Sequence, residues 1–186
     1  IKNVCHDEKV TLIPFVNTKI LEFKKGQNIP ILKEFSEFDA VISLPKLKTH
    51  CLTKITASIK NSYGLVVGNA KSHFHNHYPS PKKMSIFIGE LYGHLKPGFV
   101  ILDAIDCMEG EGPNCGASKH IGIVMAGKDG VAVDSCAALV FGYRYKDILH
   151  IQVAADKGFG IANDSNIEKV GSGVSEIGKV KCKHSK

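Results

Sequence analysis

The sequence lacks several features that would each define a class of protein. It has no apolar run long enough to span a bilayer, so no membrane-spanning segment and no membrane partner are predicted. Residues 1–8 have neither the charged start nor the apolar stretch of a signal peptide, which favours a cytoplasmic protein. The chain also begins without methionine. We therefore expect one domain over residues 1–186, truncated at its N-terminus.

The cysteines lack the spacing of a metal or cluster site. They are scattered, and no pair forms Cys-x-x-Cys; the six are Cys5, Cys51, Cys107, Cys115, Cys136 and Cys182. A disulfide scaffold is not expected at this chain length, and neither is an iron–sulfur cluster held by this chain alone. Reduced thiols in a cytoplasmic protein are the prediction.

Acidic residues are missing from one long segment. Residues 40–89 contain no Asp or Glu but seven lysines, while the whole chain has a net charge of +6. Positive charge concentrated in one segment creates a local electrostatic field that favours an anionic partner. The alternative is a lysine-rich solvated surface. Nucleic acid is not the expected partner, because the only arginine is Arg144 and basic residues do not alternate with aromatic ones.

The apolar pattern predicts strands that alternate with helices. Strands are predicted at 10–15, 40–44, 99–102, 121–125 and 167–170, and helices at 52–62, 80–95, 130–141 and 146–157. Such alternation is typical of βαβ units. The expected fold is therefore α/β, with a three-layer, mostly parallel sheet and helices on both faces. Ligands of such sheets bind at the carboxyl ends of strands.

The first candidate segment follows the predicted strand 40–44. On a helix, Thr49, Thr53, Thr56 and Lys60 would lie within roughly 60° of one another and line one edge. That edge, at a helix N-terminus, would suit an anion. Alternatively, the threonines bond to their own helix and the lysines are solvated. The predicted anion-binding residues are Lys46, Lys48, Thr49, Thr53, Thr56, Asn61 and Lys71.

The second and third candidate segments contain histidines and carboxylates. His73, His75 and His77 would share one face of an extended chain and could hold zinc or nickel, or they lie in a surface loop. Asp103 ends a predicted buried strand and begins an acidic, glycine-rich loop that could hold a divalent metal such as magnesium; the alternative is an exposed acidic loop. The predicted metal ligands are Asp103, Glu109, Asp134 and His75. For Asp134, the alternative role is a favourable charge near a helix N-terminus.

These motifs resemble one protein family. Residues 44–50 (LPKLKTH), then Thr53, Thr56, Lys60-Asn61 and Gly64, followed by Lys71 and His75, are similar to the signature of the domain of unknown function 362 family. Further similarity lies at 103–105, 108–110, 112–113 and 116, and at Asp129-Gly130 and Asp134. The resemblance covers residues 39–171. Many members of this bacterial and archaeal family carry ferredoxin-like iron–sulfur segments, which this sequence lacks.

Two functional hypotheses follow. In the first, the chain is an enzyme or ligand-binding domain in which a Lys/Thr/His site for a small anionic ligand faces an acidic, metal-binding loop. Its catalytic residues would be His50, Lys60, Asp103 and Glu109. In the second, the chain is non-catalytic and its lysines dock a ferredoxin or another iron–sulfur domain. The sequence does not decide whether the chain is an enzyme.

Overall fold

Strand β6 (Phe99–Glu109) is the centre of the main sheet in the computed structural model, which describes residues 1–24, 26–172, 177, 180, 182 and 183. The short strands β3 (Ile42–Ser43) and β4 (Lys46–His50) follow one another along one edge of β6, and both run parallel to it. Strand β7 (Ala117–Gly127) pairs antiparallel with the other edge. Strand β5 (Lys54–Thr56) extends the sheet beyond β4 as an antiparallel hairpin.

The remaining elements connect these strands or lie beside them. The helices are α1 (Lys2–Asp7), α2 (Ser58–Ser62), α3 (Ala70–His77), α4 (Pro81–Tyr92), α5 (Gly130–Val140) and α6 (Leu149–Asp156). Short 3₁₀ turns lie at Lys33–Ser36, Tyr63–Leu65, Tyr145–Asp147 and Asp164–Asn166. Strands β1 (Thr18–Lys24) and β2 (Gln27–Leu32) form a separate antiparallel hairpin. The predicted α/β class is confirmed.

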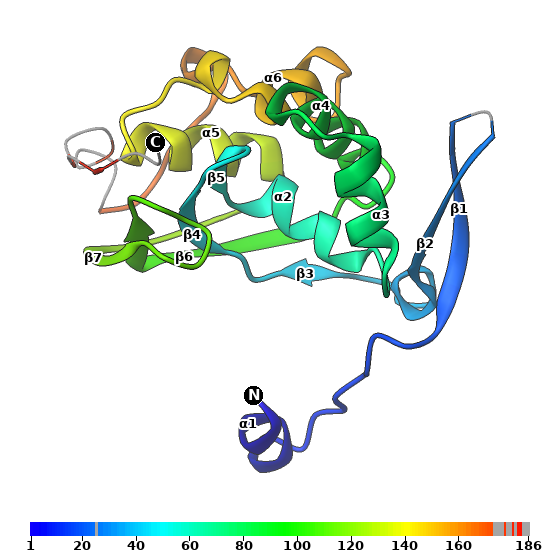
Figure 1. Cartoon of the computed structure of the whole chain (residues 1–186). Coiled ribbons are helices and arrows are strands. Elements are labelled where there is room, and N and C mark those ends of the chain that lie inside the picture. The colour runs from blue at the N-terminus through cyan, green and yellow to red at the C-terminus, as the bar shows by residue number, and fades with distance from the viewer. Residues whose placement is uncertain (25, 173–176, 178–179, 181, 184–186) are drawn as a thin grey trace.

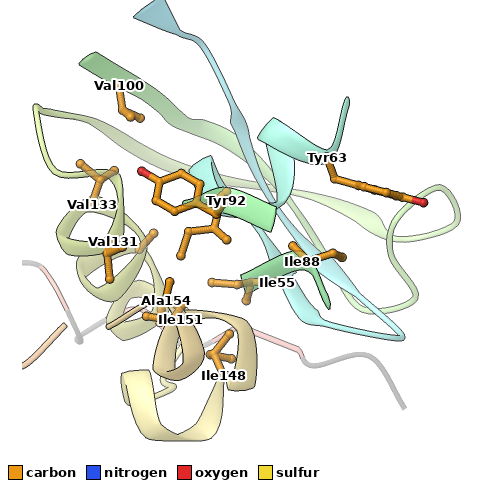
Figure 2. Close-up of a cluster of buried hydrophobic side chains, with 14 of the residues drawn as sticks. Ile55, Tyr63, Ile88, Tyr92, Val100, Val131, Val133, Ile148, Ile151 and Ala154 are labelled. Carbon is orange, nitrogen blue, oxygen red and sulfur yellow. The ribbon is translucent and has the colours of Figure 1, made fainter. Parts of the chain in front are cut away.

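The core lies between the sheet and the helices on one of its faces. Alternate residues of β6, namely Val100, Leu102 and Ala104, are buried beneath the helices. Apolar side chains from β5, α4, α5 and α6 meet there (Figure 2). Helix α4 begins as the sequence predicts, with Ser80 accepting a hydrogen bond from the Lys83 N–H at 3.2 Å and Pro81 in the first turn.

The other face of the sheet carries exposed apolar side chains. On it lie Ile42, Leu44, Ile101, Ile105 and Val124, and all five are exposed. Figure 1 shows the helices that pack on the sheet gathered on the opposite face, with only α1 on this side. Helix α1 buries none of its residues. The sequence analysis expected helices on both faces of the sheet. Among the described residues, helices pack on one face only.

Several predicted elements are wrong. Residues 52–62 do not form one helix: a turn and β5 come first, because β-branched Thr53, Ile55 and Thr56 favour extended backbone and β5 pairs with β4. Strands predicted at 10–15 and 167–170 are absent from these described residues, which find no ladder partner. Residues 66–79, where no helix or strand was predicted, contain helix α3. The strand predicted at 99–102 continues to Glu109.

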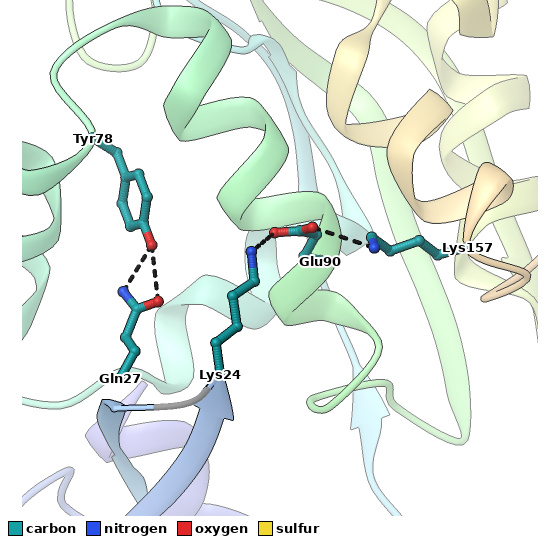
Figure 3. Close-up of polar contacts among 5 residues, drawn as sticks. All are labelled: Lys24, Gln27, Tyr78, Glu90 and Lys157. Atoms are coloured by element: carbon teal, nitrogen blue, oxygen red, sulfur yellow. Dashed lines mark hydrogen bonds and ion pairs between the residues drawn. The ribbon is translucent and has the colours of Figure 1, made fainter.

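A partly buried glutamate connects the β1–β2 hairpin to the helices. The Glu90 carboxylate on α4 binds Lys24 Nζ at 2.5 Å and Lys157 Nζ at 3.3 Å (Figure 3). Burial alone would raise the pKa of Glu90, but the two lysines together lower it below its usual value. Beside this pair, Gln27 and Tyr78 exchange hydrogen bonds of 2.7 and 3.0 Å. The hairpin is thus anchored by polar contacts on both sides of its turn.

Candidate basic site

Helix α2 holds Lys60 in a fixed place because its first turn is capped from another element. The buried Asp134 carboxylate of α5 accepts the backbone N–H of Ser58 at 2.6 Å and that of Ile59 at 2.9 Å. These N–H groups open a helix and have no partner within it. Asp134 therefore acts as a helix cap supplied by a distant part of the chain, and it fixes the direction in which Lys60 leaves α2.

Four basic side chains gather around Lys60, and with it they form what we call the basic cluster. It consists of Lys48, His50, Lys60, Lys71 and His75. The charges of Lys60, Lys48 and His75 all lower the pKa of His50, and those of Lys48 and Lys71 lower that of Lys60. All five come from the segment without acidic residues. Like charges held this close favour an anion between them.

His50 offers a hydrogen-bond donor to this cluster. Its Nδ1 accepts the backbone N–H of Leu52 at 3.1 Å, which fixes the neutral tautomer with the proton on Nε2. Burial, and then the neighbouring positive charges, lower the pKa of His50 to about 4. At neutral pH the ring is therefore an uncharged Nε2–H donor.

Lys60 is half-buried and its charge is only weakly compensated. Burial is the main reason that its pKa falls to about 8, and Lys48 and Lys71 lower it further, while Cys51 acts in the opposite direction. Its Nζ lies 6.0 Å from the centre of the Tyr63 ring, and the His75 ring lies 6.1 Å from the same ring. Lys71 Nζ donates to the Gly64 carbonyl at 2.9 Å. The pKa of Lys60 therefore lies close to neutrality.

Unpartnered polar groups lie beside the cluster. Thr56 stands opposite Lys48 in the β4–β5 ladder, and its buried hydroxyl has no hydrogen-bond partner among the residues that the structure describes. His150 on α6 is fully buried, and neither of its ring nitrogens has a partner within the described part of the chain. Burial, followed by the charges of Lys60 and His50, lowers the pKa of His150 to about 3. A buried polar group without a partner is costly. His150 was missed in the sequence because a lone histidine on an apolar helix gives no signal.

Other predicted anion-binding residues are engaged elsewhere. Lys46 Nζ binds the Asp103 carboxylate at 2.7 Å, and both side chains lie on the exposed face of the sheet. Thr49 Oγ1 donates to the Gly110 carbonyl at 2.8 Å, and Thr53 Oγ1 donates to the Ile55 carbonyl at 3.1 Å. Asn61 Nδ2 donates to Ser43 Oγ at 3.0 Å. The structure therefore groups Lys48, Thr56 and Lys71 with His50 and Lys60, and separates them from these four.

The acidic residues predicted as metal ligands occupy separate places. Asp103 pairs with Lys46, Glu109 accepts the backbone N–H of Lys183 at 3.0 Å, and Asp134 caps α2. His75 belongs to the basic cluster. Within the described ranges no three His, Cys, Asp or Glu side chains gather as a metal would require. The histidines also do not share one face: His73 stacks on His77 at 6.2 Å, while His75 meets Tyr63 on another side of α3.

One cavity of the fold does not border the basic cluster. Its volume is about 590 Å³, and it lies between β7, α5 and the segment 161–172. Its lining is mostly apolar and includes Ile123, Met125 and Cys136. The basic cluster is thus a local electrostatic site, distinct from this cavity.

The fold and the cluster define an α/β protein with a concentrated basic site. The chain belongs to the family described as "Domain of unknown function (DUF362)", which it matches over residues 1–139. The family resemblance stated from the motifs is confirmed.

One curated relative is the "Thylakoid-associated protein sll1697" of Synechocystis sp. (strain ATCC 27184 / PCC 6803 / Kazusa). It is 30% identical over 133 residues, which are 66% of this chain and 41% of the relative. The chain therefore spans about two fifths of the length of that relative. No solved structure matches the chain significantly. Among the described residues, the longest helices are too short or too polar to cross a membrane.

Proposed function

We propose that this chain binds a small anionic ligand, bearing phosphate or carboxylate groups, at the basic cluster. The observation that carries the proposal is the half-buried Lys60, held by a capped helix among Lys48, His50, Lys71 and His75. Burial and the neighbouring lysines disfavour the charged form of Lys60. A bound anion would stabilise that charged form. A ligand with two or more negative charges fits best, because three lysines meet there.

The ligand would find donors of different kinds at this site. Lysine ammonium groups supply charge, the His50 Nε2–H supplies a directed hydrogen bond, and the unpartnered hydroxyl of Thr56 lies next to Lys48. If the ligand is a substrate, Lys60 is the candidate proton-transfer group, because burial lowers its pKa to about 8, which is near neutrality. His50 would act as a donor. Asp103 and Glu109, which sit apart from the cluster, have no part in this proposal.

The alternative is docking of an acidic protein such as a ferredoxin. Lys54, Lys82 and Lys83 are exposed and could steer such a partner. Lys48, Lys60 and Lys71 are only partly accessible, which suits a small ligand better than a flat protein surface. In the first function a small anion neutralises the charge of Lys60, whereas in the second an acidic protein surface does so.

The experiment is a thermal-shift panel of chloride, acetate, malonate, phosphate and pyrophosphate, each with and without magnesium. A ligand that binds only the folded protein raises the unfolding midpoint by mass action. We expect a rise that grows with ligand charge at constant ionic strength and that does not need magnesium. No shift with any multivalent anion would leave docking as the better account.

A further inference from the structure

The exposed apolar face of the sheet is unusual for strands that pair in parallel. Parallel pairs are normally covered on both faces. Here the face defined by Ile42, Leu44, Ile101, Ile105 and Val124, which we call the open face, is accessible; Leu44 is 70% and Val124 is 55% exposed. Apolar surface gathered in this way marks a binding surface.

A second exposed apolar surface belongs to the same chain. Residues 1–16, which we call the N-terminal arm, contain Val4, Val10, Leu12 and Val16, all exposed. Helix α1 in this arm buries no side chain. Figure 1 shows the arm leaving the fold on the side of the sheet away from the helices, which is the side of the open face.

The two surfaces are compatible in charge. Two pairs of opposite charge lie on the sheet beside the open face: Lys46 with Asp103 at 2.7 Å, and His120 with Asp106 at 2.7 Å. The arm is also nearly neutral, because its lysines are balanced by Asp7 and Glu8.

The arm also has a fixed point next to the open face. Phe15 lines a cavity of about 260 Å³ together with Ile42 and Leu44 of the open face. The base of the arm therefore lies at the edge of the open face. Residues 1–14, when extended, span roughly 45 Å, which exceeds the roughly 36 Å length of an eleven-residue strand such as β6.

We propose that the open face is covered by the N-terminal arm of a second copy of this chain, in a symmetric exchange. In the single chain, the arm lies off its own sheet, and none of the residues that the structure describes covers the open face. In a dimer with two-fold symmetry, the arm of each copy covers the open face of the other copy, so both arms and both faces are buried. Because both arms contribute, the buried area is doubled, as a stable dimer requires.

The test is the mass of the full chain by sedimentation velocity over a wide range of concentration. Two substitutions place a charge on exposed positions that the fold tolerates: Val124→Asp on the open face and Leu12→Asp in the arm. The matched control is Val170→Asp, because Val170 is 84% exposed and lies on neither surface. Circular dichroism checks that each variant is folded.

We expect the full chain and Val170→Asp to be dimers, and each of the other two variants to be a monomer. A mixture of Val124→Asp and Leu12→Asp should recover part of the dimer, because one copy brings an intact arm and the other an intact face. A full chain that stays monomeric at every concentration overturns the proposal. A dimer that survives both substitutions also overturns it, because another surface would then hold the copies together.

Discussion

The carboxylate of Asp134 accepts the backbone N–H of Ser58 at 2.6 Å, although 76 residues separate the two in sequence. This contact, with the one to Ile59, joins α5 to the first turn of α2 and so positions Lys60. Sequence alone suggested a metal ligand or a helix-end charge for Asp134. In the structure Asp134 is a charge at a helix N-terminus, but the helix is α2 and not α5, to which Asp134 belongs.

Replacing Asp134 with Asn should loosen α2. The amide has one acceptor where the carboxylate uses two, so one buried N–H loses its partner, and we expect a loss of about 1–3 kcal/mol in unfolding free energy. Urea titration of the variant measures this. Asp39→Asn, at an exposed position, is the matched control. Equal stability of both variants would show that the cap contributes nothing.

The same residue should give stability a distinct dependence on pH. Burial raises the pKa of Asp134 to about 7, and its hydrogen bonds to Ile59 and Ser58 only partly oppose this. The folded state therefore holds a proton that the unfolded chain releases near pH 4, and stability falls as pH rises from about 4 to about 7. Asp134→Asn should lose this slope, so its deficit relative to the natural chain should shrink over that range. A deficit that grows instead would contradict the assignment.

Anion binding should be coupled to a proton on Lys60. An anion raises the lowered pKa of Lys60 again, so binding near pH 8 takes up protons, and affinity falls as pH rises through about 8. Calorimetry in two buffers with different ionisation heats measures the uptake. Lys60→Met should abolish it. If the measured binding enthalpy is the same in both buffers between pH 7.5 and 9, no proton is taken up, and the ligand lies away from Lys60.

His50 should remain neutral and keep one tautomer through the physiological range. Nitrogen chemical shifts from NMR should show a protonated Nε2 and an unprotonated Nδ1 at pH 6, because the Leu52 N–H occupies Nδ1 and the pKa is about 4. Exposed His77 serves as the reference ring. A His50 ring that titrates near pH 6.5 would mean that it is not buried beside the lysines.

The link between the β1–β2 hairpin and the helices should depend on Glu90. Glu90→Gln removes the charge that both Lys24 and Lys157 bind, and we expect a loss of about 1 kcal/mol, because the lysines are half exposed. The pKa of Glu90 is lowered in the folded state, so this contribution is present above about pH 4.5 and disappears as pH falls. Glu22→Gln, on the exposed side of β1, is the control in thermal unfolding.

The sequence predicted the fold where local signals were strong. Ser80-Pro81 marks the start of α4, and the apolar run at 99–102 marks β6. Both signals depend on only a few neighbouring residues, so the sequence alone reveals them. It failed at Lys54–Thr56, where β-branched residues compete with a helical pattern and pairing with β4 decides the outcome. The antiparallel direction of β7 is likewise a property of the whole sheet.

The site could be predicted only in part. The acid-free segment pointed to Lys48, His50, Lys60 and Lys71, because charge composition is local. The argument that placed four residues on one helix edge was wrong, yet Thr56 still reaches the cluster through the β4–β5 ladder. Asp103 could not be separated from the cluster by sequence, because its pairing with Lys46 depends on the register of β4 against β6.

The most direct test of the account compares two lysines from the same acid-free segment. Pyrophosphate is titrated calorimetrically into the natural chain, Lys60→Met and Lys82→Met at pH 7. Each variant loses one positive charge, but only Lys60 lies in the basic cluster. We expect Lys60→Met to weaken binding by roughly ten-fold or more, as the loss of a charged hydrogen bond predicts, and Lys82→Met to leave it nearly unchanged. Equal weakening in both variants would show that the anion senses only the overall charge of the chain, and would contradict a site at Lys60.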